Sequence, residues 1–235
     1  MKKYIILLIA WALISPAMFA SGNDKGEKMI VKIEKGDLAG TVVLRLANLE
    51  KKSTQIAVQC TDGTIWFSKN IRRKSAFATK MDLRRLPVGD YVFFVRNGSS
   101  MHTQAFAVNN DGIAFFNKPS ENRDGSALIT QFTDMSDLSL GVKLANLQNR
   151  PATIQITMMG YDQVYDKTIR GENGFVKSFN MTGMSDGNYF VCVKSVDATV
   201  MQFFTIEESH LTLGDNQRLN RPKDIVVPEE IVIEQ

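Results

Sequence analysis

The chain has 235 residues, of which 44% are hydrophobic and 23% charged, and its formal net charge is +3. This composition is typical of a folded globular protein and excludes a disordered or collagen-like chain. Because there are only 2 cysteines and 2 histidines, the chain offers no disulfide framework and little material for a metal site or a histidine-based active site. We therefore expect no cofactor and no bound metal.

A short apolar segment opens the chain. Lys2 and Lys3 precede an apolar run from Tyr4 to Ile14, and small residues follow it. The run is too short to span a bilayer of about 30 Å, and its layout is typical of a secretory signal peptide. We expect residues 1–20 to direct export, so that the mature protein is periplasmic, cell-surface or extracellular and not membrane-spanning. The spacing leaves three cleavage points open, after Ala17, Ala20 or Gly22.

Seven short β-prone segments follow in the first half of the chain. Several alternate apolar and polar residues, as half-buried strands do, and Asp62-Gly63 is typical of a tight hairpin turn. A final apolar segment, Ile113–Phe116, is expected to fold back onto these strands or to pack against a neighbour. The seven predicted strands are Met29–Ile33, Thr41–Ala47, Gln55–Cys60, Ile65–Phe67, Phe77–Leu83, Tyr91–Val95 and Gln104–Val108.

A second set of seven strands follows a polar stretch at 117–125. This stretch contains Pro119 and lacks apolar periodicity, so it is predicted to be a linker. Leu211–Leu213 is expected to play the same part as the final apolar segment of the first set. The predicted strands are Leu128–Phe132, Gly141–Ala145, Thr153–Met158, Gln163–Tyr165, Phe175–Met181, Tyr189–Val193 and Met201–Ile206.

The two strand sets are copies of one unit. Leu46-Ala47-Asn48-Leu49 recurs as Leu144-Ala145-Asn146-Leu147, a shift of 98 residues, and the same shift aligns Lys69, Phe77, Gln104 and Phe106 with identical residues in the second copy. Short strands with turn residues between them, in a unit of this length, indicate an immunoglobulin-like β-sandwich. We therefore predict an all-β fold of two tandem immunoglobulin-like or fibronectin-like sandwiches at 28–116 and 126–213, and a tail at 214–235.

Each copy carries a tyrosine where a central strand is expected to begin. Gly89-Asp90-Tyr91 in the first copy matches Gly187-Asn188-Tyr189 in the second. In immunoglobulin-like sandwiches a tyrosine at this place bonds its hydroxyl to the nearby backbone, which is called a tyrosine corner. A structural role is therefore expected for both tyrosines.

The motifs of one copy resemble a known family. Ala47-Asn48-Leu49, Asp62-Gly63 and the Leu-x-x-Gly-x-Tyr turn at Leu86–Tyr91 occur in the order found in the immunoglobulin-like modules of secreted Bacteroidetes proteins, including the C-terminal sorting domains of type IX secretion. The resemblance implies a Gram-negative exported protein with this fold. It implies no functional residue.

The charge is distributed unevenly between the copies. Residues 28–110 contain 14 Lys and Arg against 6 Asp and Glu, whereas residues 126–207 contain 6 against 8. An electropositive surface of the first copy would attract an anionic partner, either an acidic protein or an acidic glycan. The alternative is a solvated face, or docking of the acidic tail of the same chain. The residues that concentrate the positive charge are Lys69, Arg72, Arg73, Lys74, Lys80, Arg84 and Arg85.

Three further features have a functional and a structural interpretation. Trp66 is either a core residue, which we favour, or an exposed platform for stacking a sugar ring. Asp134 and Asp137 could pair as the acids of a hydrolase, although solvated loop residues are the simpler interpretation. Two β-prone runs in the tail, at 225–227 and 231–233, are expected either to add an edge strand to the second copy or to form a frayed terminus, which we favour, or to add a strand to the sheet edge of a partner.

These observations favour an exported, non-catalytic scaffold or protein-interaction protein of the periplasm or cell surface. The expected partners are an envelope or surface protein, or an acidic glycan, and not nucleic acid. A glycan-binding module that uses Trp66 is the alternative, and a hydrolase is a second, weaker alternative.

Overall fold

The computed structural model describes residues 28–98, 100–117, 128–135, 138–161 and 163–220. The expected signal peptide, most of the expected linker and residues 221–235 lie outside these ranges. The described residues form strands joined by turns and no helix, which confirms the all-β prediction. Accordingly, no helix in these ranges is long and apolar enough to cross a membrane.

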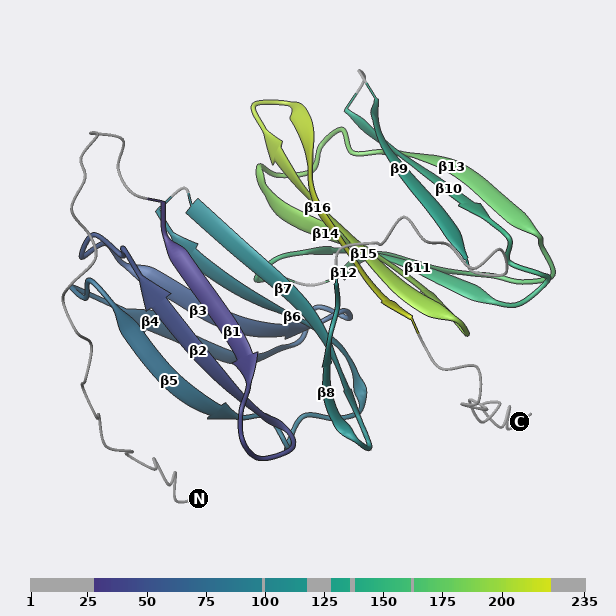
Figure 1. The fold of residues 1–235 in the computed structure, drawn as a ribbon. Helices are drawn as coiled ribbons and strands as arrows, with labels where there is room; N and C mark the ends of the chain where they lie inside the picture. Colours follow the sequence, from purple (N-terminus) through teal and green to yellow (C-terminus); the bar gives the residue numbers. More distant parts are fainter. Residues whose placement is uncertain (1–27, 99, 118–127, 136–137, 162, 221–235) are drawn as a thin grey trace, which may run out of the picture.

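The first copy, here called module 1 (residues 28–117), is a sandwich of a three-stranded and a five-stranded antiparallel sheet (Figure 1). The strand order is β1-β2-β5 in the smaller sheet and β4-β3-β6-β7-β8 in the larger one. Their bounds are β1 Ile30–Lys35, β2 Thr41–Ala47, β3 Thr54–Cys60, β4 Ile65–Ile71, β5 Phe77–Asp82, β6 Gly89–Asn97, β7 Ser100–Asn109 and β8 Gly112–Phe115.

The second copy, module 2 (residues 128–220), has the same topology. Its smaller sheet has the order β13-β10-β9 and its larger sheet the order β12-β11-β14-β15-β16. The bounds are β9 Ile129–Met135, β10 Ser139–Ala145, β11 Ala152–Met158, β12 Gln163–Ile169, β13 Gly174–Asn180, β14 Gly187–Ser195, β15 Ala198–Glu207 and β16 His210–Asn220.

Every predicted strand coincides with an observed one, and each module has an eighth strand besides. The apolar segment at 113–116 forms β8, which pairs with β7, and its counterpart opens β16, which pairs with β15. Strand β16 continues to Asn220. The second sandwich therefore extends seven residues past its expected end at 213, and this part of the expected tail belongs to the sheet.

The central strands show two kinds of hydrophobic pattern. In β2 the residues Val42, Leu44 and Leu46 are buried and face the partner sheet, as the alternation predicts. In β6 every residue from Tyr91 to Val95 is at most 1% exposed. A strand with a continuous apolar run is buried on both faces, so the larger sheet of module 1 must be covered on both sides.

Both tyrosine corners are present. The Tyr91 hydroxyl donates a hydrogen bond to the Pro87 carbonyl at 2.7 Å, and the Tyr189 hydroxyl donates to the Ser185 carbonyl at 2.6 Å. Tyr91 stacks on Phe106 with ring centroids 5.4 Å apart. The repeated tyrosines are therefore structural, as predicted.

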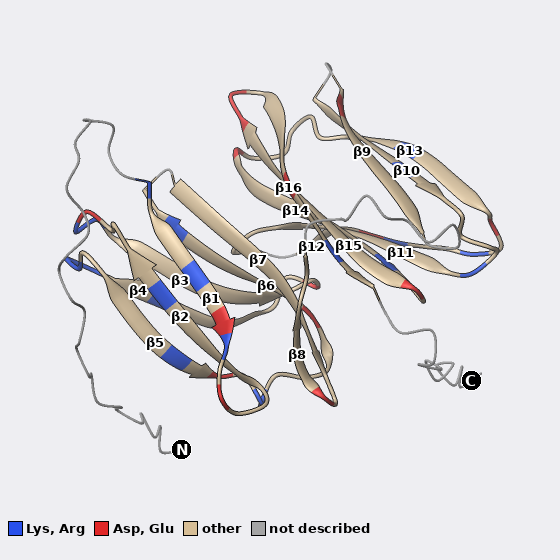
Figure 2. Ribbon diagram, viewed as in Figure 1, with Lys and Arg blue, Asp and Glu red and all other residues tan. Residues whose placement is uncertain are grey.

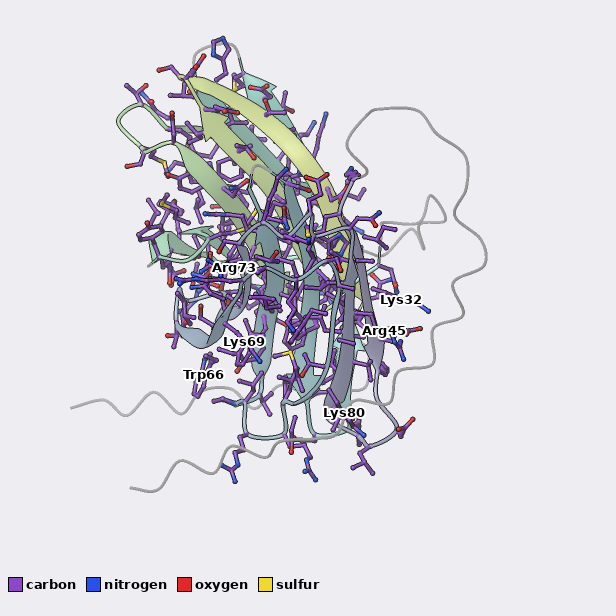
Figure 3. The ribbon with its side chains drawn as sticks, turned by 90° about the vertical axis from the view of Figure 1, so that its left-hand side faces the viewer. Lys32, Arg45, Trp66, Lys69, Arg73 and Lys80 are labelled. Atoms are coloured by element: carbon purple, nitrogen blue, oxygen red, sulfur yellow. The ribbon has the colours of Figure 1, made fainter. Side chains whose placement is uncertain are left out.

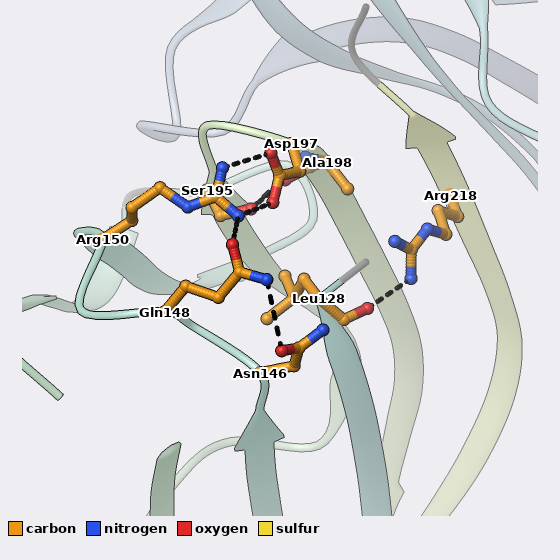
Figure 4. A network of polar contacts seen from close by, with 8 residues as sticks. All are labelled: Leu128, Asn146, Gln148, Arg150, Ser195, Asp197, Ala198 and Arg218. Carbon is orange, nitrogen blue, oxygen red and sulfur yellow. Dashed lines mark hydrogen bonds and ion pairs between the residues drawn. The ribbon is translucent and has the colours of Figure 1, made fainter. Parts of the chain in front are cut away.

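The repeated Leu-Ala-Asn-Leu motif forms the turn after β2 and β10. Asn48 and Asn146 adopt positive φ angles of 57° and 64°, a left-handed conformation that asparagine tolerates better than most residues. The turn places Leu49 and Leu147 in the cores of their modules. In module 2 this turn is also fixed by Arg150, whose guanidinium donates to both carboxylate oxygens of Asp197 at 2.6 and 2.5 Å (Figure 4).

A repeated glutamine holds the eighth strand of each module. The Gln104 side-chain amide donates to the carbonyls of Ala105 and Phe116, both at 2.9 Å. The Gln202 amide makes the equivalent bonds to Phe203 and Gly214, both at 2.8 Å. In module 2 the side chain thus supplies bonds where the backbone pairing of β15 and β16 is interrupted, and in module 1 it does so where the pairing of β7 and β8 ends.

The two larger sheets pack face to face, so that the molecule has four layers (Figure 1). The cluster between them takes equivalent residues from both modules: Val92 and Phe190, and Ala105 and Phe203. Phe94 and Cys192 form a further equivalent pair. This is the cover that the apolar run of β6 requires, and the same holds for β14.

Hydrogen bonds cross the contact at equivalent places. The Gln59 side chain donates to the carbonyl of Tyr161 at 2.6 Å and accepts from the Gly160 amide at 2.9 Å. Thr157, which is the counterpart of Gln59, donates its hydroxyl proton to the Thr61 carbonyl at 2.7 Å. An interface in which equivalent surfaces contact one another in this way has approximate two-fold symmetry.

Candidate functional site

The structure distributes the seven predicted basic residues over three parts of module 1. Arg72, Arg73 and Lys74 form the loop between β4 and β5, and Lys69 lies at the end of β4 beside them. Lys80 lies on β5, facing away from the core. Arg84 and Arg85 follow the C-terminal end of β5. At 3.4 Å per residue this strand is about 20 Å long, so these two arginines lie at the opposite end of the module from the β4–β5 loop.

Lys80 belongs to the outer face of the smaller sheet. Cations from three adjacent strands meet on this face (Figure 2). The register places Lys32 on β1 directly opposite Arg45 on β2. Lys80 on β5 lies opposite the β2 residue that is two positions before Arg45. Glu34 forms ion pairs with both Lys32 and Arg45, and Lys80 lies 3.7 Å from Asp37. Lys32, followed by Arg45, lowers the pKa of Glu34. Much of the charge on this face is therefore neutralised within it.

Arg84 is also paired within the module. Its guanidinium donates to both carboxylate oxygens of Asp82, at 2.9 and 2.6 Å. These hydrogen bonds, together with the Arg84 backbone amide, lower the pKa of Asp82 to about 2. Arg84 is thus less suited to hold an external anion than its exposure suggests.

Lys69 has a structural contact that is repeated in module 2. Its ammonium group lies 5.1 Å from the centroid of the Phe77 ring, and Lys167 lies 5.5 Å from the Phe175 ring. A cation over an aromatic ring is attracted by the electrons of the ring face. The repetition of Lys69 and Phe77 is explained by this pair.

The β4–β5 loop has no such internal explanation, and among the described residues Arg85 has no ion pair either. Arg72, Arg73 and Lys74 are exposed, and within the described ranges none of them forms an ion pair with a carboxylate. Arg73 has a positive φ of 56°, whereas its counterpart in module 2 is Gly171, with a φ of 69°. A left-handed conformation costs a non-glycine residue about 1 kcal/mol or more. Module 1 therefore carries an arginine where the backbone favours glycine.

Trp66 is not a core residue, so the core interpretation is wrong. The strand register pairs Val58 with Phe67 and Gln59 with Ile65, which leaves Trp66 as the extra residue of a bulge on the edge strand β4. Its side chain is 46% exposed, and its counterpart Val164 is 52% exposed. Trp66, Lys69 and Arg73 lie on one side of the module, away from Lys32, Arg45 and Lys80 (Figure 3).

The remaining titratable residues are dispersed. Asp134 lies within β9, not in a loop as expected, and Asp137 is outside the described ranges. Burial lowers the pKa of His102, whereas His210 is exposed at the β15–β16 turn. Cys192 is buried between the modules, and Cys60 is partly buried. Across the residues that can be placed, no three His, Cys, Asp or Glu side chains gather as metal ligands would.

Comparison with known proteins identifies no family for this chain. No protein-family model and no curated protein matches the chain. Among solved structures, a two-domain fibronectin type-III segment from chicken tenascin is 10% identical, covers 82% of this chain and 98% of its own, and has a TM-score of 0.23. The strand order and the tyrosine corners establish each module as a sandwich of the immunoglobulin and fibronectin type-III kind.

The contact between the modules is not predicted in the expectations from the sequence. The feature of the sequence that belongs to it is the pair of continuous apolar runs Tyr91–Val95 and Tyr189–Val193. Both runs were predicted only as strands. The run itself indicates two buried faces, and the structure shows that the second face covers the other module.

Proposed function

We propose that the chain is an exported, non-catalytic scaffold or protein-interaction protein of the periplasm or cell surface. Its two modules would act as one rigid body, because their larger sheets share a buried apolar contact. Module 1 would engage an acidic surface of an envelope protein through the basic β4–β5 loop. The observation that carries the proposal is Arg73, which keeps a strained backbone conformation where module 2 has Gly171.

The backbone conformation of Arg73 and the charge of its loop together support this function. A residue that holds a costly conformation on the surface gains nothing for folding, so its side chain is the feature to explain. Arg72, Arg73 and Lys74 together present three cations at one end of the sandwich, whereas Arg170, Gly171 and Glu172 in module 2 carry no net charge. Exposed cations of this kind attract an anionic partner over about 8–10 Å at physiological salt.

The double variant R73G/K74E tests this function by giving the loop the residues of module 2. We expect it to lose partners that the wild-type protein captures from an envelope extract at low salt. We also expect Arg73→Gly alone to increase the free energy of unfolding by about 0.5–1 kcal/mol, because glycine relieves the left-handed strain.

The matched control is K35Q/K143E, which changes the net charge by the same amount at exposed positions away from the loop. It should retain the partners. Capture that is the same for R73G/K74E and the wild-type protein contradicts the proposed role of the loop. Arg72→Gly removes the same charge one residue earlier, at a position without a positive φ. It should lower the free energy of unfolding, because glycine relieves no strain there. The two glycine variants therefore distinguish the effect of backbone strain from the effect of charge.

Glycan binding is the second candidate function, and the exposure of Trp66 favours it. An aromatic ring half exposed on the same side as Lys69 and Arg73 (Figure 3) could stack on a sugar while the cations bind its acidic groups. A glycan array with the wild-type protein and Trp66→Ala distinguishes the two functions. If the wild-type protein binds acidic glycans and Trp66→Ala does not, the partner is a glycan and not a protein. If the wild-type protein binds no glycan on the array, glycan binding is excluded.

A further inference from the structure

One difference between the two halves of the module contact changes the charge there. Lys194 of module 2 forms an ion pair with Asp90 of module 1 at 3.2 Å, and the Asp90 side chain is only 2% exposed. The shift of 98 residues relates Lys194 to Arg96, and Asp90 to Asn188. The symmetry-related position thus retains the cation and replaces the carboxylate by an amide.

This second position is open, whereas the first is closed by its ion pair. Arg96 and Asn188 both line a cleft of about 850 Å³ between the modules. One wall is the β6–β7 hairpin of module 1, with Arg96, Gly98 and Met101, and the other is formed by β14, β15 and β16. Its volume lies within the range of small-ligand sites, which favour domain interfaces.

The cleft separates positive and negative charge. Arg96 supplies a guanidinium on the wall of module 1, and the wall of module 2 supplies the carboxylates of Asp186, Glu207 and Glu208. Asp186 accepts a hydrogen bond from the Glu208 amide at 3.3 Å, which holds these two residues together. His210 lies beside them. A ligand that fits must carry a negative group toward Arg96 and a positive group toward the acidic wall.

We infer that this cleft binds a short peptide segment in which a carboxylate side chain is followed by basic side chains. The carboxylate takes the place that Asp90 occupies in the symmetry-related pair and accepts from the Arg96 guanidinium, the geometry in which charged hydrogen bonds are strongest. The basic side chains contact Asp186, Glu207 and Glu208. This site is distinct from the β4–β5 loop, so either one can fail without the other.

The test compares two peptides, N-acetyl-Asp-Lys-Lys-amide and N-acetyl-Ala-Lys-Lys-amide, by titration calorimetry with the mature protein. We expect the wild-type protein to bind the first about tenfold more tightly, the effect of one charged hydrogen-bonded contact. For Arg96→Gln the two peptides should bind alike. Equal binding of both peptides to the wild-type protein, or binding of neither, overturns the inference.

Asn188→Asp provides a second, independent measurement. The new carboxylate should pair with Arg96 as Asp90 pairs with Lys194, and it can still accept the Thr205 hydroxyl bond that Asn188 accepts at 3.0 Å. We expect a rise in melting temperature of about 2–4 °C and the loss of the preference for the aspartate peptide. Retention of this preference by Asn188→Asp would show that the peptide carboxylate lies elsewhere.

Discussion

Tyr91 and Tyr189 show how single residues fix each module. Each hydroxyl is bonded to a carbonyl four residues upstream, and each ring stacks on a phenylalanine of the next strand. Burial, which disfavours the charged phenolate, is the main cause that raises the pKa of Tyr91 to about 12, and it raises the pKa of Tyr189 as well. The position was predictable because a tyrosine after a Gly-containing turn is repeated in both copies.

Tyr91→Phe should lower the free energy of unfolding by about 1 kcal/mol at neutral pH, the worth of one hydrogen bond. In the wild-type protein the folded pKa lies above the ordinary value of 10.0. The unfolded chain therefore loses its proton first, and stability falls as the pH rises from about 10 to about 12. Denaturation by urea at pH 7 and between pH 9 and 11.5 measures both effects. The variant should lose less stability over the alkaline range than the wild-type protein, and an equal loss would exclude the pKa shift of Tyr91.

At the scale of elements, the eighth strand distinguishes these modules from a seven-stranded sandwich. The apolar segment at 113–116 and its counterpart were expected to fold back onto the strands or to pack against a neighbour, and neither was predicted to be a strand. The pairings with β7 and β15 are both supported by a glutamine side-chain amide: Gln202 bridges an interruption of the β15–β16 ladder, and Gln104 holds the end of the β7–β8 ladder. The repetition of the glutamine is visible in the sequence, whereas the carbonyls that it reaches are set by the folded edge.

Gln104→Ala should release β8 locally. The side-chain bonds to the Ala105 and Phe116 carbonyls are lost, so the amides of β8 should exchange with deuterium faster while those of β6 remain protected. Gln202→Ala is the matched control, because it should act on β16 and leave β8 unchanged. Unaltered exchange in β8 after Gln104→Ala would show that the backbone ladder alone holds this strand.

At the scale of the whole molecule, the two modules are predicted to behave as one cooperative unit. Phe190 is fully buried in the contact, opposite residues of β6 and β7. Its neighbours include Cys192 and Met201 from module 2 and Val92 and Phe94 from module 1. Removal of this ring should therefore be felt in both modules.

Phe190→Ala should lower the free energy of unfolding by about 3–5 kcal/mol, the usual cost of deleting a buried phenylalanine ring. It should also accelerate hydrogen exchange in β6, although the substitution is in β14. Phe179→Ala is the control, since Phe179 belongs to the internal core of module 2. If β6 exchanges at the same rate in Phe190→Ala and the wild-type protein, the modules are not coupled through this contact.

The sequence by itself determined the duplication, the strand positions, the tyrosine corners and the excess of positive charge in module 1. These depend on local periodicity, turn chemistry and repetition, all of which are read along the chain. It did not determine the exposure of Trp66, because a bulge on an edge strand redirects this residue away from the core. The sequence also did not show which of the basic residues have an acidic partner. Lys80 and Arg84 lie beside a carboxylate, whereas Arg73 forms no ion pair among the described residues and has a strained backbone.

The tertiary structure alone decided how the two copies meet. Linear spacing cannot tell which face of a doubly apolar strand covers the other module, because both faces read alike in the sequence. Packing of the larger sheets brings Lys194 to Asp90 and Arg96 to Asn188 across more than 90 residues of chain. There the difference between Asp90 and Asn188, which are equivalent in the two copies, becomes a difference in charge at a shared surface.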